Sequence, residues 1–178
     1  EPFAPIVTDC LPKEGANWRA SEQDFRERAD FRSLLICSID PPGCTDIDDA
    51  LHARPLDPSN PSGHWEIGVH IADVTHFVKP STPLDQEAAH RATSVYLVDR
   101  RIDMLPELLG SDLCSLHCNV ERLAFSVVWV VDQNGAIHDC KFTKSIIQSK
   151  RSFTYDQAQL ILDDPNSTEE FAPSIKFL

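Results

Sequence analysis

A long β-hairpin is predicted in the last third of this 178-residue chain, over residues 122–148. In its first half an apolar side chain recurs at every second position, at Phe125, Val127, Trp129 and Val131. That period is typical of a strand with one buried face. An Asn-Gly pair then follows at Asn134-Gly135, which is a strong signal for a hairpin turn. The return strand is predicted over residues 136–148, so the fold must contain a substantially antiparallel sheet.

Two more strands are predicted upstream. Residues 33–39 are a short apolar run bounded by Asp40-Pro41-Pro42-Gly43, which is typical of a buried strand that ends in a sharp loop. After a surface turn at residues 57–63, alternation resumes along residues 65–71, at Trp65, Ile67, Val69 and Ile71. We expect these four side chains to lie on the buried face of a strand.

Three helices are predicted beside the strands. Ser21 with Asp24 indicates a short charged helix over residues 21–30. Residues 83–95 open with proline and early acids, and Thr154 precedes an amphipathic helix over residues 155–162. The tail after that helix is polar and acidic.

The predicted fold class is α/β or α+β, with a mixed, substantially antiparallel sheet and flanking helices. Residues 1–32 are expected to be a lead-in segment with a short helix, docked through Trp18. Residues 33–178 are expected to form the main domain.

Composition excludes several classes of function. Sixteen Lys and Arg against 28 Asp and Glu give a net charge of −12, so nucleic acid cannot be held by bulk charge and must be bound locally. No apolar run approaches the roughly 18 residues of a membrane span, and no secretion signal is visible. The six cysteines are expected to be free thiols. Zinc at Cys114, His117 and Cys118 is an alternative that lacks a second ligand pair.

Four carboxylates crowd into ten residues that contain no Lys or Arg, at Asp40, Asp46, Asp48 and Asp49. Two carboxylates about 4 Å apart repel by roughly 4 kcal/mol at an effective dielectric of about 20. Such a cluster protonates or splays unless a cation neutralises it. Pro41, Pro42 and Gly43 would turn the chain back and let the carboxylates converge. A divalent metal ion is the simplest cation that would neutralise the four carboxylates.

Oxygen ligands favour Mg²⁺, Mn²⁺ or Ca²⁺. An EF-hand starting at Asp46 is improbable, because its third position is Ala50 and its required glycine is Leu51. What remains is a Mg²⁺ site with open positions, as used in phosphodiester hydrolysis. Two alternatives stay open: an acidic surface loop with Asx-turns, and a phosphatase loop of the haloacid dehalogenase type, for which Ala50 stands where Thr or Val is required.

Three motifs together resemble one family. They are DPPGCTDIDDALH at residues 40–52, GVHIADV at 68–74, and DMLPELL at 103–109 with LCSL at 113–116. They closely resemble the ribonuclease II/R (RNB) family, and within it the branch that serves the eukaryotic RNA exosome as catalytic subunit. The resemblance implies that residues 33–178 are the N-terminal part of an RNB catalytic domain, truncated at its C-terminal side.

The resemblance implies a hydrolytic, processive exoribonuclease that degrades single-stranded RNA from its 3′ end and releases nucleoside 5′-monophosphates. Mg²⁺ would be the cofactor, with Mn²⁺ as a substitute. The metal ligands and catalytic residues would be Asp40, Asp46, Asp48 and Asp49. Asp48 resembles the residue whose loss inactivates family members without abolishing RNA binding. The branch further implies exosome core subunits as partners of the parent protein, a nuclear, nucleolar and cytoplasmic location, and no role for DNA or membranes.

Contacts to RNA are implied for two tyrosines and several cations. Tyr96 matches the family's tyrosine that stacks on the 3′-terminal nucleotide, and Tyr155 matches a tyrosine near the active site. The candidates for phosphate contact are Arg100 and Lys150, with Arg101, Lys144 and Arg151 beside them. His70 and Asp73 would support the metal ligands from behind if their strand paired with residues 33–39.

The family's C-terminal motifs, including an active-site arginine, do not occur in these 178 residues. We therefore expect the chain alone to be inactive or nearly so. The alternative is a catalytically inactive scaffold that keeps the RNB fold and binds RNA. The presence of all four aspartates favours the enzyme, and metal binding at the aspartate loop would separate the two.

Overall fold

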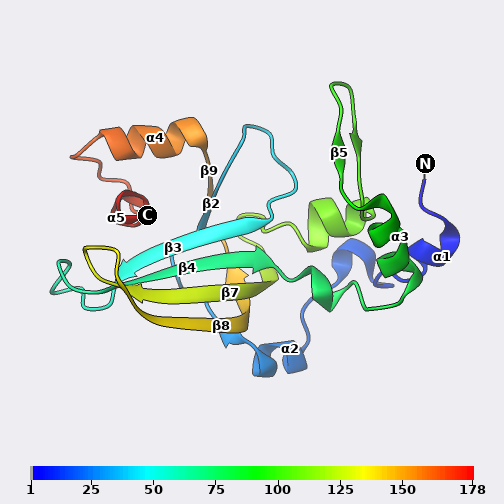
Figure 1. The fold of residues 1–178 in the computed structure, drawn as a ribbon, viewed down its shortest axis with the longest axis horizontal. Coiled ribbons are helices and arrows are strands. Elements are labelled where there is room, and N and C mark those ends of the chain that lie inside the picture. Colours follow the sequence, from blue (N-terminus) through cyan, green and yellow to red (C-terminus); the bar gives the residue numbers. More distant parts are fainter. Residues whose placement is uncertain (1) are drawn as a thin grey trace.

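The computed structural model describes residues 2–178 and contains, within them, a seven-stranded sheet (Figure 1). Glu1, the first residue of the predicted lead-in, lies outside the described residues. Neighbouring strands are antiparallel except at the two edges, where β1 runs parallel to β8 and β9 runs parallel to β2. In spatial order the strands are β1 (Ala29–Asp30), β8 (Ile137–Gln148), β7 (Glu121–Val131), β4 (Trp65–Ala72), β3 (Asp49–Pro55), β2 (Cys37–Asp40) and β9 (Arg151–Thr154).

Helices flank this sheet, and a separate small hairpin stands beside it. β5 (Val95–Tyr96) pairs only with β6 (Arg101–Ile102) among the described residues, and this hairpin projects upward in Figure 1. The helices are α1 (Pro5–Thr8), α2 (Glu22–Glu27), α3 (Pro83–Arg91), α4 (Tyr155–Asp163) and α5 (Ala172–Phe177), with 3₁₀ turns at Gly15–Asn17 and Val74–His76 and a π-helix, η3, at Leu108–Leu113. The predicted fold class is confirmed. No helix within residues 2–178 is long and apolar enough to cross a membrane.

The predicted hairpin at residues 122–148 is confirmed. β7 and β8 pair along their whole length, from Glu121 opposite Gln148 to Val131 opposite Ile137. In the turn, the N–H of Asn134 donates to the carboxylate of Asp132 at 2.8 Å. This pair of long strands forms one half of the sheet and sets the register of β4 beside it.

The predicted helix starts are also confirmed, because each has a hydrogen-bonded cap. Ser21 and Thr154 both form a capping box with the residue three positions on, which satisfies backbone donors at the first turn. The helix expected over residues 83–95 ends earlier, at Arg91. Ala92 takes a φ of 64°, a value that a right-handed helix cannot contain.

One prediction about burial is wrong. Ile71 is 44% exposed and Ile67 and Val69 are only half-buried, whereas His70, on the opposite face of β4, is fully buried. The reason is that the main core lies on the face of His70, where it includes Ala50, Ala72, Ala124 and Ile147. On the other face, α5 reaches the sheet at one end, where Phe177 stacks on Trp65 with ring centroids 4.0 Å apart.

The predicted strand at residues 33–39 is also too long. The N–H of Leu34 donates to the carbonyl of Phe31 in a turn, and β2 begins only at Cys37. The helix expected over residues 21–30 ends at Glu27, and β1 follows it. Five strands and two helices had no prediction: β1, β3, β5, β6, β9, α1 and α5. The strand β3 matters most, because it begins at Asp49 and carries the end of the aspartate loop.

The lead-in segment packs on the same core as the rest of the chain. Val7 is 4% exposed within the main hydrophobic cluster, and Trp18 packs edge-on against Phe77 with ring centroids 4.8 Å apart. The docking role predicted for Trp18 is confirmed. Arg28 pairs with the buried Asp73 at 2.6 Å, so the segment is tied to the sheet by charge as well as by apolar contact.

A chain of hydrogen bonds crosses the buried face of the sheet. His52 Nδ1 lies 2.8 Å from His70 Nε2, His70 Nδ1 lies 2.7 Å from Ser126 Oγ, and Ser126 Oγ lies 2.6 Å from Ser145 Oγ. These four residues come from β3, β4, β7 and β8 and are at most 2% exposed. Burial, and then the neighbouring His52, lower the pKa of His70 to about 3. His70 is therefore neutral near pH 7.

The neutral His70 makes the fold sensitive to acid. Its pKa falls from 6.5 to about 3 on folding, so the unfolded chain takes up the proton first as the pH drops. The stabilising effect of the neutral His70 is complete above pH 6.5. Below that value the free energy of unfolding declines by up to about 1.4 kcal/mol per pH unit as the pH falls toward 3. Urea unfolding at a series of pH values should show a shallower decline in His70→Gln than in wild type. His90→Gln, at an exposed histidine, should keep the wild-type slope; equal slopes in all three proteins would contradict this assignment.

Gly68 is required by the same hydrogen-bond chain. A Cβ at this position would overlap the His52 ring, so Gly68→Ala must displace His52 from His70. We expect a loss of about 1–3 kcal/mol in the free energy of unfolding, the usual cost of overpacking. Gly110→Ala is the matched control, because nothing lies within 4 Å of a Cβ built there. Urea unfolding that ranks the two variants equally would argue against the steric role of Gly68.

Candidate active site

The four aspartates lie on the loop that joins β2 to β3. Asp40 is the last residue of β2 and Asp49 the first of β3, and these strands pair antiparallel. The N–H of Cys44 donates to the carbonyl of Pro41 at 3.2 Å, and Gly43 takes a φ of +79°, which suits the third residue of a type II turn. The predicted turn is therefore present, and it brings both ends of the loop to the same end of the sheet.

The second half of the loop is fixed by one buried side chain and two hydrogen bonds. Ile47 is 5% exposed in the main core, so the side chains on either side of it, Asp46 and Asp48, are directed away from the core. Ser115 Oγ accepts the N–H of Ile47 at 3.0 Å and donates to the carbonyl of Thr45 at 2.9 Å. The position of the acids thus depends on a segment about 70 residues further along the chain.

The carboxylates act on one another through their charges. Burial raises the pKa of Asp48, and Asp46, Asp49 and Asp40 raise it further. Burial and then Asp40 raise the pKa of Asp49. The Oδ2 atom of Asp40 is buried and has no hydrogen-bond partner among the described residues. A buried carboxylate oxygen without a partner is costly, so Asp40 offers an unused ligand atom.

These features fit a hard divalent cation. The donor set consists of carboxylate oxygens, as Mg²⁺ and Mn²⁺ prefer, and Asp40 supplies an oxygen that no other group in the described part of the chain satisfies. As the side chains stand, no three His, Cys, Asp or Glu residues within 2–178 form a group that could hold an ion. Asp46 is the member of the four that is engaged elsewhere, because it contacts the β5–β6 hairpin.

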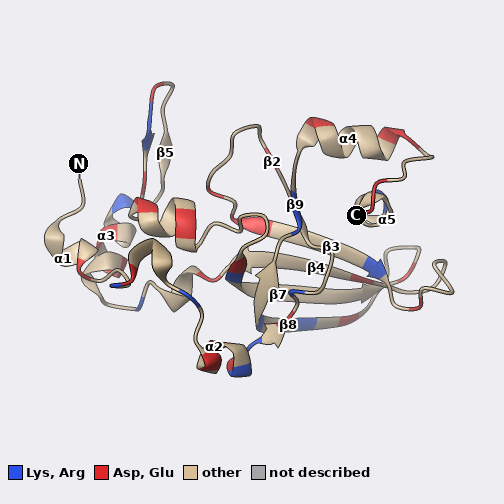
Figure 2. Ribbon diagram, turned by 180° about the vertical axis from the view of Figure 1, so that it is seen from behind, with Lys and Arg blue, Asp and Glu red and all other residues tan. Residues whose placement is uncertain are grey.

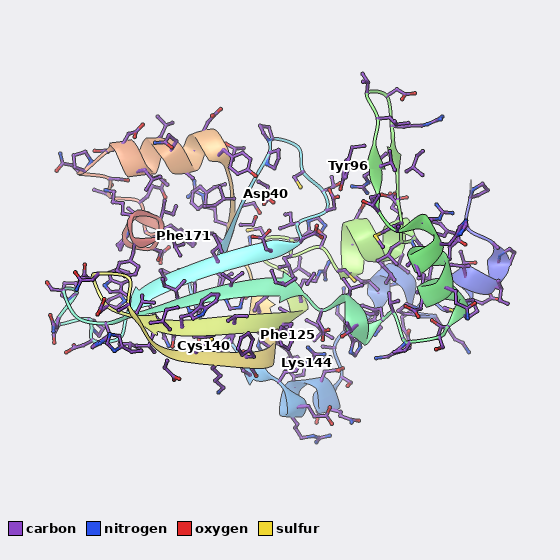
Figure 3. The ribbon with its side chains drawn as sticks, in the orientation of Figure 1. Asp40, Tyr96, Phe125, Cys140, Lys144 and Phe171 are labelled. Carbon is purple, nitrogen blue, oxygen red and sulfur yellow. The ribbon has the colours of Figure 1, made fainter. Side chains whose placement is uncertain are left out.

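Two side chains of that hairpin hold Asp46. The Tyr96 hydroxyl donates to Asp46 Oδ2 at 2.5 Å, and Arg101 Nη1 lies 2.9 Å from Asp46 Oδ1. The hydrogen bond to Asp46 raises the pKa of Tyr96 to about 12. Tyr96 is nevertheless 67% exposed. In Figure 3 the hairpin residue Tyr96 and the strand-end residue Asp40 lie on either side of the loop.

A pocket of about 430 Å³ lies between the loop and the hairpin. Asp46 and Asp48 form one wall, and Tyr96, Arg101 and Met104 are among the residues of the other. This volume is within the range of small-ligand sites. The pocket therefore joins two of the predicted acids to the predicted stacking tyrosine.

Tyr155 lies on the other side of the loop. β9 runs parallel to β2 with Thr154 opposite Asp40, and Tyr155 follows Thr154 as the first residue of α4. Tyr155 is 59% exposed, so its ring does not pack in the core. The two predicted tyrosines thus approach the loop from opposite ends, Tyr96 at Asp46 and Tyr155 at Asp40.

The five basic candidates divide into two groups. Arg101 is paired with Asp46 and Asp103, Lys144 with Asp73, and Arg151 with Glu169. Arg100 is exposed and Lys150 Nζ donates to Gln148 at 2.7 Å, and neither makes an ion pair with any residue in the range 2–178. Arg100 and Lys150 remain the predicted phosphate contacts.

His70 and Asp73 have other partners than those expected. The strand β4 pairs with β3 and β7, not with β2, so the proposed pairing with residues 33–39 is wrong. His70 bonds to His52 and Ser126 within the core, and Asp73 pairs with Arg28 and Lys144. The link from β4 to the loop is instead a backbone one, from the N–H of Ala72 to the carbonyl of Asp48 at 2.9 Å.

The contacts of two site residues were not predicted from the sequence. Arg101 was expected to meet phosphate, and it meets Asp46 instead. Ser115 had no predicted role, although it lies in the LCSL motif, and it is held in turn by the buried Arg122, whose Nε donates to the carbonyl of Ser115 at 2.8 Å. The cysteines are free thiols, and His117 donates to the carbonyl of Ser111 rather than joining a metal group.

Comparison with known proteins identifies the family. The model of the RNB domain matches residues 28–176, and the chain therefore belongs to the RNB domain family. The exosome complex exonuclease dis3 of Schizosaccharomyces pombe is 55% identical over 181 residues, which cover 99% of this chain and 18% of that protein. The exosome complex exonuclease RRP44 of Homo sapiens is 53% identical over 178 residues, covering 100% of this chain and 18% of the relative.

The fold is shared with a solved enzyme of the same family. The structure of Mycoplasma genitalium RNase R in complex with double-stranded RNA superimposes with a TM-score of 0.82 at 27% identity, over 99% of this chain and 31% of that one. The chain thus spans about a fifth of the curated relatives it matches, at 18% of each of the two named above. The loop and hairpin described above lie within the matched range.

The Ser115 anchor predicts a specific local change. Ser115→Ala leaves the N–H of Ile47 and the carbonyl of Thr45 without partners, which should cost about 1–3 kcal/mol in the free energy of unfolding. The loop should loosen as well, so the Ile47 amide should exchange with deuterium faster while amides in the centre of β7 exchange as before. Ser33→Ala, at an exposed serine, should change neither quantity. An Ile47 amide that remains as protected as in wild type would show that Ile47 packing alone holds the loop.

Proposed function

We propose that this chain carries the metal-holding part of a Mg²⁺-dependent, hydrolytic exoribonuclease that degrades single-stranded RNA processively from its 3′ end and releases nucleoside 5′-monophosphates. The observation that carries the proposal is the buried Asp40 Oδ2, which has no hydrogen-bond partner within residues 2–178 and lies beside two carboxylates with raised pKa values, in a chain of the RNB domain family. Such a set of oxygens lacks only the cation that would neutralise it.

The residues that would hold the metal are Asp40, Asp46, Asp48 and Asp49, with Mg²⁺ as the natural ion and Mn²⁺ as a substitute. When bound, such an ion polarises phosphate oxygens and lowers the pKa of water. The chain's own contribution is to fix the carboxylates. Asp40 and Asp49 are held by paired strands, and Asp46 and Asp48 are held on either side of the buried Ile47.

The two exposed tyrosines and the two unpaired cations suit a single strand of RNA. Tyr96 and Tyr155 present their rings at the two ends of the loop, and stacking on a base is worth roughly 1–3 kcal/mol without reading sequence. Arg100 and Lys150 are available for phosphate contacts, since neither is paired with an acid in the described range. A duplex cannot offer an unstacked terminal base, so single-stranded ends would be preferred.

The setting of the activity follows from the relatives. Two of them are named exosome complex exonucleases, which supports exosome core subunits as partners and a nuclear, nucleolar and cytoplasmic location. Because the chain spans 18% of each of these proteins, we expect the chain alone to bind metal and to leave RNA uncut. A catalytically inactive RNA-binding scaffold is the rival, and such a scaffold need not bind metal at all.

The proposal is tested by grafting this chain in place of the matching segment of the Schizosaccharomyces pombe exonuclease, with which it is 55% identical. On a 5′-labelled single-stranded RNA with Mg²⁺, the graft should produce a 3′-to-5′ ladder that ends in a short stub. Chelator should abolish the ladder. Asp48→Asn in the graft should slow it by at least about a hundredfold, a loss typical of removing one stabilising group from an active site, while RNA binding persists.

Asp57→Asn is the matched control, because Asp57 lies in the exposed turn after β3 and its carboxylate accepts hydrogen bonds, within residues 2–178, only from the N–H and hydroxyl of Ser59. It should leave the ladder unchanged. RNA that stays intact in the wild-type graft, or cleavage that is indifferent to both chelator and Asp48→Asn, would favour the scaffold.

A further inference from the structure

Both carboxylate oxygens of Asp46 are occupied by a single hairpin. Tyr96 on β5 donates to Oδ2 at 2.5 Å, and Arg101 on β6 contacts Oδ1 at 2.9 Å. The two residues lie directly opposite each other across the hairpin. Asp46 and Arg101 are about four-fifths buried, with side-chain exposures of 20% and 21%. The contact is therefore shielded from solvent, unlike the exposed Arg26–Glu22 pair of α2.

Arg101 is braced from behind by groups outside the hairpin strands. Its Nε pairs with Asp103, and its Nη2 donates to Ser111 Oγ on the π-helix η3 at 2.6 Å. At the base of the hairpin the N–H of Met104 donates to Ser94 Oγ at 3.0 Å. The guanidinium is thus held at Asp46 by a defined set of bonds. Figure 2 shows a basic stretch on the hairpin and acidic residues on the loop before β3.

The Arg101 guanidinium lies against Asp46, a carboxylate that the metal would need as a ligand. Asp46 points to the hairpin, and the described residues contain no group of three acids or histidines that could hold an ion. A divalent cation on Asp46 would lie within a few ångströms of the Arg101 guanidinium, and two cations so close repel strongly at low effective dielectric. The hairpin and the metal therefore compete for one carboxylate.

We propose that Arg101 is a positioning residue that acts as the counter-ion of Asp46 in the metal-free chain, and that binding of a divalent cation at the aspartate loop releases Asp46 from Arg101 and Tyr96. Release frees the Tyr96 hydroxyl and lets the hairpin move, so that metal loading repositions the Tyr96 ring, which is already 67% exposed. The inference rests on the proposed function for the identity of the metal site.

The first test measures the affinity of the full 178-residue chain for Mn²⁺, from the paramagnetic resonance signal of the free ion. Arg101→Gln should bind Mn²⁺ about tenfold more tightly than wild type, because a competing cation has been removed. Arg100→Gln is the matched control, since it removes the same charge from the neighbouring exposed residue. It should change the affinity by less than about twofold, because exposed charges are screened.

Because Arg101→Gln also loses its bonds to Asp103 and Ser111, a second variant keeps that bracing intact. Tyr96→Phe removes only the hydroxyl on Asp46 Oδ2 and should tighten Mn²⁺ binding by about threefold, the effect of losing a hydrogen bond of typical net strength. Near-wild-type thermal unfolding of both variants in the absence of metal would show that the chain remains folded.

The second test follows the tyrosine itself by ¹⁹F NMR of the chain labelled with 3-fluorotyrosine. The sequence has two tyrosines, and Tyr155→Phe assigns the two signals. Addition of diamagnetic Mg²⁺ should shift the Tyr96 resonance, because its hydroxyl loses a carboxylate acceptor. In Arg101→Gln the shift should occur at a lower Mg²⁺ concentration.

The outcomes separate this inference from the proposed function. Wild-type binding of Mn²⁺ with equal affinities in Arg101→Gln and Arg100→Gln would overturn the competition and leave the metal site standing. Weaker binding in Arg101→Gln would show that the guanidinium assists the metal, which also overturns it. No Mn²⁺ binding in any of these proteins would remove the proposed metal site and the inference with it.

Discussion

Repulsion among the carboxylates of the β2–β3 loop is the constraint that the surrounding structure has to resist. A free loop would relieve it by splaying. Here Asp40 is fixed by the pairing of β2 with β9 and Asp49 by the pairing of β3 with β4, while Ile47 is fixed in the core between Asp46 and Asp48. Each acid is adjacent to an element that cannot move without breaking sheet or core contacts. Burial, and after it the neighbouring carboxylates, raise the pKa values of Asp48 and Asp49.

The buried hydrogen-bond chain and the acidic loop share one strand, and that fixes their relation. β3 carries Asp49 at its start and His52 three residues later, on the opposite face. A slip of one residue against β4 would turn His52 toward solvent and Asp49 toward the core. The contact of His52 with His70, and the close approach of Gly68 to its ring, therefore select the register in which the acids face outward.

The sequence predicted the elements whose signals are local. The β7–β8 hairpin follows from alternation and an Asn-Gly turn, and the helices at Ser21 and Thr154 follow from caps that the structure contains. The aspartate loop was predicted from its own composition, which is four aspartates with no Lys or Arg among them. The strand β3 escaped prediction because it begins at Asp49 and ends at Pro55, residue types that are both uncommon in strands. Its existence depends on β4, whose paired residues lie 10 to 22 positions further along the chain.

What the sequence could not predict is which partner a charged or polar side chain takes. His70 was expected behind the metal ligands, yet its nearest polar neighbours are His52 and Ser126, since β4 lies next to β3 rather than β2. Arg101 was grouped with phosphate contacts because a lone basic residue carries no mark of its partner. Only the packing of the hairpin against the loop brings it to Asp46. The contacts that decide these roles join residues that lie 18 to 56 positions apart in the chain.

The net charge of −12 bears on how an RNA strand could approach the aspartate loop. Three of the five candidate phosphate contacts are paired with the chain's own acids, Arg101 among them, so an RNA strand that approaches the metal-free loop meets unneutralised carboxylates. Phosphates are repelled by such a surface until a cation reduces its charge. If the cation also displaces Arg101 from Asp46, the same step that lowers the negative charge of the loop releases the Tyr96 hydroxyl, while Arg101 keeps its contacts with Asp103 and Ser111. Metal would then bind first and RNA second, because the acids of the loop repel phosphates until the cation reduces their charge.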